Sequence, residues 1–466
     1  MKPSIFRPRH LAVAISVTLF TANLAYADAT SNELLNILKA KSILTEQEYN
    51  ALAQRVKDDE EKTAKKRTDE AIVKFKDGLT ISSADGQHSI HLGGRIQADY
   101  RAFSNPDAQN ADTFDIRRAY LQADGKFYDR YNYMVAANFA GAPALVYAYV
   151  DANFDKAAKV MVGQFKMPMG MEELTSSRFI NFQERSLAMQ FVPAIDRGVM
   201  LHGEPAKGVY YALSVSNGTG ANVAESDNLQ DGKDVTGRLV VNFAEMIGDK
   251  NAIYHLGGSH SNGDLSVTKS ALSASTEAKG GKFFNTADFS GDSVDRSRYG
   301  LETVLAYGPV KLQGEYINNN FKGRSAGGVS YDRGLDSYYV ALNWMITGES
   351  YASAYKGFKF DRMRPKQNFG MNNGLGGWEI GVRYSKLDAS DFTTTNAAGT
   401  GVLTTGTANQ ADAWTLGVKW LINPNTRAML NYVETNFDTP VKYTSGTVTG
   451  TADKEKAITM RVQLDF

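Results

Sequence analysis

Cysteine is absent from this chain of 466 residues. Disulfides and thiolate chemistry are therefore excluded, and the stability of the fold must come from other interactions. An excess of one charge is also lacking, since 51 Lys and Arg balance 51 Asp and Glu. Such a chain has no general attraction for nucleic acid or for anionic lipid, so we expect no nucleic-acid partner.

Catalytic motifs are lacking as well. The sequence contains no Walker-type loop, no HExxH motif and no G-x-S-x-G nucleophile elbow. His88 and His91 fall on opposite faces of a regular strand, as do His255 and His260, and no Ser-His pair on one face is evident. We therefore expect no catalytic residue, no cofactor and no metal site, and an enzyme is only a minor competing hypothesis.

A long apolar run occurs only near the N-terminus. Lys2, Arg7 and Arg9 precede LAVAISVTLFTANLA (11–25), and the following Ala-Tyr-Ala fits a signal-peptidase site. The alternative is an N-terminal core helix. We predict a signal peptide at residues 1–27 and an exported mature chain from Asp28. Removal of its three basic residues leaves 48 basic against 51 acidic side chains, a net charge of −3.

The mature chain has strict alternation instead of apolar runs. In HLGGRIQADYRAF (91–103) apolar residues alternate with charged ones, and the closing stretch ITMRVQLDF (458–466) repeats this up to a terminal Phe466. An apolar outer face with a charged inner face is required of a transmembrane β-barrel, because lipid cannot satisfy a free sheet edge. A large soluble β-sandwich also alternates, but it would bury its apolar face. We expect the barrel.

Sixteen strands are predicted, and an even number is typical of a bacterial barrel. The stretch SYASAYKGFKF (350–360) is assigned to a long turn, because a seventeenth strand would make the number odd. The fold class is thus all-β, a 16-stranded antiparallel transmembrane β-barrel over residues 73–466. The predicted strands are 88–103, 114–127, 131–140, 144–154, 158–167, 197–204, 207–217, 233–246, 251–262, 294–307, 310–322, 335–346, 376–388, 411–422, 426–438 and 456–466.

Short turns and long external loops are expected to alternate along the barrel. Two connections are long and depart from this pattern. Residues 167–196 are moderately apolar and contain a helical stretch, so they are expected to fold into the lumen and narrow it; an ordinary surface loop is the alternative. Residues 347–375 are the second candidate for insertion into the lumen.

Residues 28–72 precede the barrel and are predicted to be helical. Thr45 and Glu48 have the spacing of a capping box that opens the second of two helices. A charged run, RVKDDEEKTAKKRTDE, follows. The segment is interpreted as a periplasmic extension, either a short coiled coil that supports an oligomer or a solvated helix.

Several motifs occur along the predicted barrel. They are VKFKDGL (73–79), LGGRIQADY (92–100), RRAYL (117–121), VGQFKMPMGMEELTSSRF with ERS (162–186), TGE with YKGFKF (347–360) and GGWEIGVRY (376–384). Together they resemble the phosphate- and pyrophosphate-selective porin family of Gram-negative outer membranes. The resemblance covers the barrel. It implies a homotrimer of sixteen-stranded barrels in the outer membrane, with a constricting third loop and a turn that folds inward.

The resemblance also implies an anion site, carried over where residues match. The matching constriction residues are Arg95, Arg117, Arg118, Tyr120, Ser176, Ser177, Arg185 and Lys356, and those of the basic periplasmic mouth are Lys74 and Lys76. The chain departs from the family pattern at Glu173, Asn132 and Val146, where the family has a constriction lysine, a lumen lysine and a lumen aspartate. The fifth-loop arginines are reduced to Arg296 and Arg298.

Strand periodicity places Arg118 inside with Tyr120, and Arg117 outside unless the strand start is irregular or the residue lies beyond the lipid belt. Arginine suits an anion pore because its planar fork matches oxyanions and stays charged; the alternative is that the pair only balances nearby carboxylates. We expect a passive outer-membrane channel that prefers anions such as phosphate through an arginine-lined constriction and contacts lipid and lipopolysaccharide. The competing hypothesis is a general or weakly selective porin for small organic solutes.

Overall fold

The computed structural model describes residues 27–41, 43–68, 71–104, 112–222, 232–265, 272–286, 294–324, 330–394, 402–445 and 448–466. The predicted signal peptide lies outside these residues, apart from Ala27. The described chain falls into two compact units. One contains the helices with residues 82–87, and the other contains residues 73–81 and 88–466.

The helical unit consists of α2 (Ala27–Ala40) and α3 (Glu46–Thr68). The predicted capping box is present, because the Glu48 amide donates to Thr45 Oγ1 at 3.3 Å and the Thr45 amide donates to Glu48 Oε2 at 2.9 Å. The Tyr49 hydroxyl donates to Asn36 Oδ1 at 2.8 Å and so joins the two helices. No helix in the described ranges is long and apolar enough to cross a membrane.

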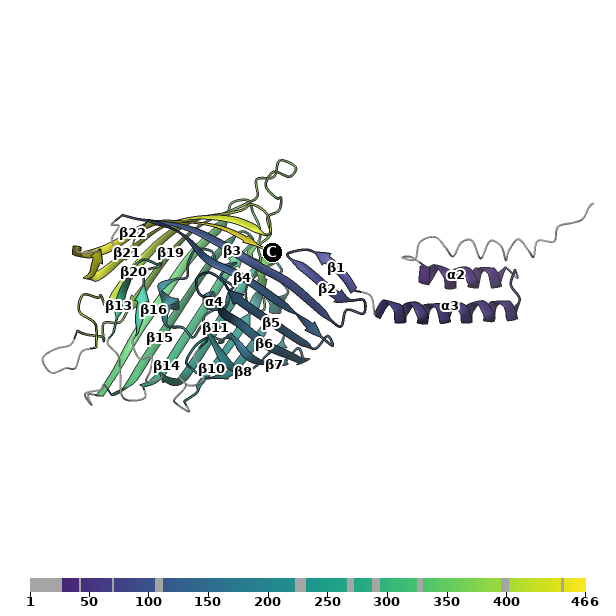
Figure 1. The fold of residues 1–466 in the computed structure, drawn as a ribbon, viewed down its shortest axis with the longest axis horizontal. Helices are drawn as coiled ribbons and strands as arrows, with labels where there is room; N and C mark the ends of the chain where they lie inside the picture. Colours follow the sequence, from purple (N-terminus) through teal and green to yellow (C-terminus); the bar gives the residue numbers. More distant parts are fainter. Residues whose placement is uncertain are drawn as a thin grey trace, which may run out of the picture. The chain divides into compact units, whose positions relative to one another are not determined.

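The second unit is a closed antiparallel barrel (Figure 1). Each of its sixteen strands pairs with the next in sequence, and the last pairs with the first, with Met460 opposite Tyr100. The predicted strand number and order are confirmed. The strands are β3 (Ser89–Phe103), β4 (Thr113–Phe127), β5 (Tyr131–Asn138), β6 (Ala144–Asp155), β7 (Ala158–Lys166), β8 (Ile195–Ala206), β9 (Val209–Ser216), β10 (Asp234–Asn242), β11 (Ala252–Leu265), β14 (Val294–Tyr307), β15 (Val310–Arg324), β16 (Ser330–Met345), β19 (Gly377–Asp388), β20 (Gln410–Leu421), β21 (Thr426–Ser445) and β22 (Val448–Asp465).

Phe466 completes the closure of the barrel. The Gly94 amide donates to the Phe466 carbonyl at 2.6 Å, and the Phe466 amide donates to the Gly94 carbonyl at 3.0 Å. Two short strands that the sequence pattern did not predict, β1 (Ala71–Phe75) and β2 (Leu79–Ser83), pair with each other, and β2 pairs with β3.

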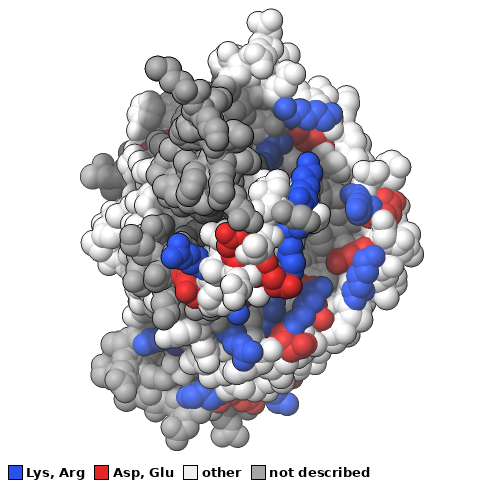
Figure 2. Space-filling view, turned by 90° about the vertical axis from the view of Figure 1, so that its right-hand side faces the viewer, with Lys and Arg blue, Asp and Glu red and all other residues white. Residues whose placement is uncertain are grey.

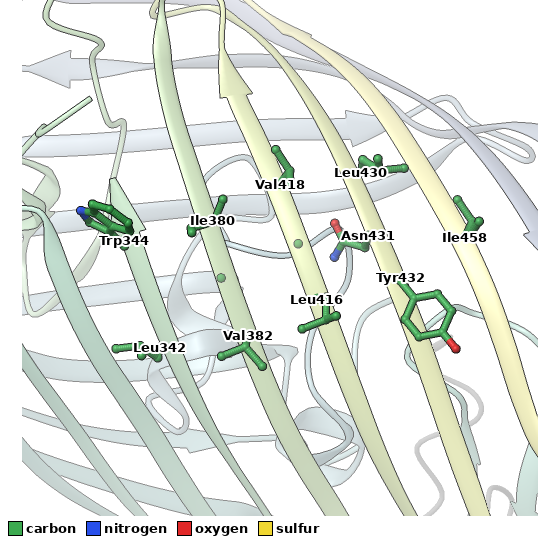
Figure 3. A pocket seen from close by; sticks show the side chains of 12 residues that line it. Leu342, Trp344, Ile380, Val382, Leu416, Val418, Leu430, Asn431, Tyr432 and Ile458 are labelled. Atoms are coloured by element: carbon green, nitrogen blue, oxygen red, sulfur yellow. The ribbon is translucent and has the colours of Figure 1, made fainter. Parts of the chain in front are cut away.

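Burial in the strands is the reverse of that in a soluble protein. In β14 the side chains of Arg298 and Glu302 are buried, whereas Leu301 and Tyr307 on the alternate positions are 61% and 64% exposed. The apolar outer surface of the barrel contains a hollow of about 580 Å³ (Figure 3). It is lined by aliphatic and aromatic side chains of β16 to β22, such as Leu342, Ile380 and Leu416. This apolar hollow is therefore no site for a hydrophilic solute.

The third loop, residues 167–194, fills much of the barrel interior, as predicted. It contains α4 (Met171–Leu174) and the 3-10 helix η2 (Leu187–Phe191). Met169, Met171 and Leu187 are completely buried. Phe182 packs where Gly381 and Gly417 leave room, since a Cβ on either glycine would lie within 3.1 Å of its ring. The loop thus covers the inner face of the wall from β15 to β22.

Two further segments fold inward. The turn after β16 contains η4 (Tyr351–Ala354), β17 (Tyr355–Lys356) and β18 (Lys359–Phe360), so residues 350–360 form no strand of the barrel wall, as predicted. The Tyr351 hydroxyl donates to Glu379 Oε2 of β19 at 2.9 Å. The fifth loop forms a hairpin, β12 (Ser273–Ser275) with β13 (Lys282–Asn285), whose Phe283 and Phe284 share an apolar cluster with Leu187.

Candidate functional site: the constriction of the barrel

Arg117 and Arg118 both face the interior, because Arg117 is the extra residue of a β-bulge in β4. Gln97 of β3 pairs with Arg118 and Ala98 pairs with Ile116, so Arg117 has no partner in the register. A bulge adds one residue to a strand and changes the direction of the side chains around it. The exception stated for an irregular strand start therefore applies, and Arg117 does not point outward as regular period-two alternation would place it.

The carboxylate of Glu184 in the third loop binds this arginine pair. Its Oε1 lies 2.8 Å from Arg117 Nε and 4.0 Å from Arg118 Nη1. Arg461 of β22 approaches the same oxygen at 2.8 Å. Burial alone would raise the pKa of Glu184, but the guanidiniums of Arg461, Arg118 and Arg117 hold the pKa well below its ordinary value of 4.5. This cluster fixes the third loop to β4 and β22.

A second cluster holds the start of the same loop. Glu173 Oε2 lies 3.0 Å from Arg185 Nε, and Glu173 Oε1 lies 3.4 Å from Lys166 Nζ. Arg185 also donates to the carbonyl oxygens of Glu173 and Thr175, at 3.1 and 2.9 Å. Glu173, where the resembling family has a lysine, is thus neutralised by two cations and lies outside the cavity described below.

The opposite wall of the barrel holds the loop through paired charges. Glu315 of β15 accepts from the amides of Met171 and Glu172, each at 2.7 Å, and so caps the start of α4. Arg383 of β19 bridges Glu172 of the third loop at 3.0 Å and Glu277 of the fifth-loop hairpin at 2.6 Å. Breaking one partner of such a buried pair is costly, because it leaves an uncompensated charge.

The interior that the loop leaves open is a cavity of about 340 Å³. It lies between strands β3 to β9, the third loop and the inward turn. Four residues that the sequence assigned to the constriction line it: Arg95, Tyr120, Ser176 and Lys356. Arg117, Arg118, Ser177 and Arg185 are not among its lining residues but contact the third loop or lie in it. Lys74 and Lys76 are exposed and do not line it either.

Positive charge predominates along the cavity. The Arg95 guanidinium donates to Ser176 Oγ at 3.3 Å and lies 3.9 Å above the Tyr120 ring. Arg178, Lys166, Lys356 and Lys359 also line the cavity, and Asp361 is the carboxylate among the described lining residues. Figure 2 shows Lys and Arg interspersed with Asp and Glu on the end of the molecule that is on the right in Figure 1.

The sequence pattern missed Arg178, Lys359 and Glu184 as functional positions. All three lie in segments that were predicted to enter the lumen, so their charges had to be either paired or exposed to the pore. Within the described residues Arg178 and Lys359 form no ion pair, whereas Glu184 does. Arg296 and Arg298 of the fifth-loop region share the carboxylate of Asp234, at 2.6 and 3.2 Å.

Comparison with known proteins gives one family. Its profile, described as phosphate-selective porin O and P, matches residues 90–466. Porin O of Pseudomonas aeruginosa is 28% identical over 403 residues, which cover 79% of this chain and 87% of that protein. Among solved structures, the anion-selective porin from Comamonas acidovorans is 13% identical with a TM-score of 0.49, over 81% of this chain and 100% of that one. The outer membrane channel DcaP of Acinetobacter baumannii is 10% identical, also with a TM-score of 0.49, over 81% of this chain and 97% of that one.

Proposed function

Because the chain belongs to the phosphate-selective porin O and P family, and is therefore an outer-membrane porin of a Gram-negative bacterium and not an enzyme, we propose that it is a passive channel that prefers anions. Inorganic phosphate is among the anions that we propose to pass. The observation that carries the proposal is the cavity between the third loop and strands β3 to β9, where cations outnumber carboxylates.

The free cations of the cavity are the proposed source of selectivity. Arg178, Lys356 and Lys359 line the cavity and form no ion pair within the described part of the chain. Arg95 is 6% exposed, and its Nε has no hydrogen-bond partner. One such cation attracts a monovalent anion by roughly 4 kcal/mol at about 4 Å and an effective dielectric constant near 20, before desolvation is subtracted.

The arginine pair has a different role in this proposal. Arg117 and Arg118 contact Glu184 and do not line the cavity, so we propose that they hold the third loop in place and act on a passing anion less directly than the lining cations do. The constriction remains arginine-lined through Arg95 and Arg178. We propose that Ser176 helps to orient Arg95, since its Oγ accepts a hydrogen bond from that guanidinium.

Four further proposals concern the whole chain. Residues 1–27 act as a signal peptide, residues 28–72 form a periplasmic extension, and residues 73–466 form the barrel in contact with lipid and lipopolysaccharide. The barrels assemble as a homotrimer. Cross-linking of the protein in intact outer membranes tests the assembly, and N-terminal sequencing of the mature protein tests the cleavage after Ala27.

Ion selectivity tests the proposed function. Purified full-length protein is inserted into a planar bilayer, and the reversal potential is measured in a potassium chloride gradient. We expect a potential displaced toward the equilibrium potential of chloride, and a chloride current that orthophosphate reduces. A potential displaced toward that of potassium would refute the anion channel and favour a cation-tolerant general porin.

A further inference from the structure

The open wall of the cavity is mainly aromatic and rich in methionine, with Lys166 and His202 as its charged or titratable members. Tyr147 and Tyr149 of β6 and Phe165 of β7 line it, together with Met134 of β5 and Met200 of β8. On the other side of the barrel, Glu315 of β15, Arg383 of β19 and Arg461 of β22 contact the third loop. The pore is therefore bordered by the less polar half of the barrel interior.

The free cations face this wall from three separate elements. Arg95 comes from β3, Arg178 from the third loop, and Lys356 and Lys359 from the inward turn. The Arg95 guanidinium lines the cavity and donates to Ser176 through Nη1. The cavity thus joins cationic side chains without an ion pair in the described residues to an aromatic and thioether surface.

An inorganic anion fits only part of this site. The cations attract it, but thioether and ring surfaces offer little to replace the water that phosphate loses on entry. A carboxylate on a flat ring satisfies both parts. Its oxygens match the guanidinium fork, and its ring makes edge or offset contacts with Tyr and Phe and contacts methionine sulfur. A cavity of about 340 Å³ lies within the range of small-molecule pockets.

We infer that the cavity prefers small aromatic carboxylates, of which benzoate is the simplest, over inorganic anions and over aliphatic carboxylates. The inference rests on the proposed anion channel and specifies its solute class. Arg95 and Arg178 hold the carboxylate, the lysines of the inward turn draw the anion to the cavity, and Tyr147, Tyr149 and Phe165 contact the ring.

Block of the chloride current by four anions tests this solute class. Benzoate, cyclohexanecarboxylate, acetate and orthophosphate are each titrated at neutral pH against the full-length protein in a planar bilayer. We expect benzoate to reach half-block at a concentration roughly three- to tenfold below those of the other three, since the ring contacts are the added interaction. A half-blocking concentration of benzoate equal to or above that of acetate, cyclohexanecarboxylate or phosphate would overturn the inference.

Substitution of one wall residue separates the ring contact from the charge. Tyr149→Leu should raise the half-blocking concentration of benzoate roughly threefold and leave that of phosphate in place, whereas Tyr149→Phe, which keeps the ring, should behave as the parent. Tyr307→Leu makes the same change on the outward face, where Tyr307 is 64% exposed, and serves as the control. Equal shifts for benzoate and phosphate in Tyr149→Leu would contradict the aromatic contact.

The two proposals fail in different ways. If the parent's reversal potential lies toward potassium, the proposed anion channel itself is wrong. If that potential lies toward chloride but benzoate has no advantage over the other anions, the channel stands and only the aromatic preference is overturned.

Discussion

Glu184 Oε1 lies 2.8 Å from Arg117 Nε, and this contact joins the third loop to the bulge in β4. The carboxylate is 6% exposed and is shared with Arg461 at 2.8 Å. The position of the loop, and hence the width of the open cavity, therefore depends on a buried charge cluster. Different residues set the size of the pore and its ion selectivity. Variants of these residues can therefore change one property without the other.

Glu184→Gln should loosen the third loop and raise single-channel conductance. The change removes the carboxylate that Arg101, Arg117, Arg118 and Arg461 share, although Arg101 and Arg461 keep Asp99 as a partner. Breaking a buried pair typically costs about 3–5 kcal/mol. Conductance and its fluctuations are recorded in planar bilayers. Glu434→Gln is the control, because Glu434 pairs with the more exposed Lys454 and Lys456 and such surface pairs contribute about 0–1 kcal/mol. Parent-like conductance in Glu184→Gln would show that the cluster does not hold the loop.

Acid should destabilise the parent through the same carboxylate. The pKa of Glu184 in the folded protein is well below 4.5, so its ionised form stabilises the fold at neutral pH. That contribution declines as the pH falls below the ordinary value and through the lowered pKa, where the folded state also takes up the proton. The thermal unfolding midpoint of the parent should therefore fall in this acid range more steeply than that of Glu184→Gln. Parallel curves for the two proteins would exclude this linkage.

Arg117→Ala should raise conductance more than Arg118→Ala does. Arg117 binds Glu184 with two donors, at 2.8 and 3.3 Å, whereas Arg118 stands 4.0 Å from it and donates to Gln97 at 2.9 Å. Glu184 is shared among Arg101, Arg117, Arg118 and Arg461. Because neither Arg117 nor Arg118 lines the cavity, we expect each variant to shift the reversal potential only slightly. A large shift toward potassium in either variant would return the pair to the selectivity filter.

Gly94→Ala should lower the amount of folded barrel in the outer membrane. A Cβ at Gly94 would lie 2.4 Å from the Tyr120 carbonyl oxygen and 2.9 Å from the Phe466 ring, so backbone must move where the barrel closes. Overpacking of this kind costs about 1–3 kcal/mol. Gly258→Ala is the matched control, because its nearest atoms are 3.9 Å away. The heat-modifiable folded band on gels measures the outcome, and equal bands for both variants would contradict it.

The barrel could be predicted from the sequence because lipid imposes one simple pattern on every wall strand. Ile458, Met460 and Val462 alternate with Thr459 and Arg461. This alternation predicts that the segment is a strand and shows which of its side chains face the lipid, and the succession of such segments gives the order of the strands. The inward course of residues 167–194 was also predictable, since their apolar residues need burial. The fifth-loop hairpin was not, because Phe283 and Phe284 are packed by Leu187 and Phe392, which are far away in sequence.

The sequence predicted several residues of the candidate site correctly, but it did not predict what each of them does there. Arg95, Tyr120, Ser176 and Lys356 line the cavity together. The side of the barrel wall on which Arg117 lies could not be predicted. A single bulge moves a side chain to the other side of the wall, and the alternation of polar and apolar residues does not reveal the bulge. Which cations are free depends on the partners that the folded loop brings to them, as Glu184 does for Arg117 and Glu173 for Arg185.

Reversal potential after removal of the free lysines tests the central claim most directly. The double variant Lys356→Gln with Lys359→Gln removes two unpaired cations from the cavity. Lys207→Gln with Lys250→Gln removes the same charge from two exposed turn residues that do not line it. In a potassium chloride gradient we predict that the first variant shifts toward the potassium potential while the second keeps the potential of the parent. A first variant that retains the parent's potential would contradict the account that the free cations of the cavity set anion preference.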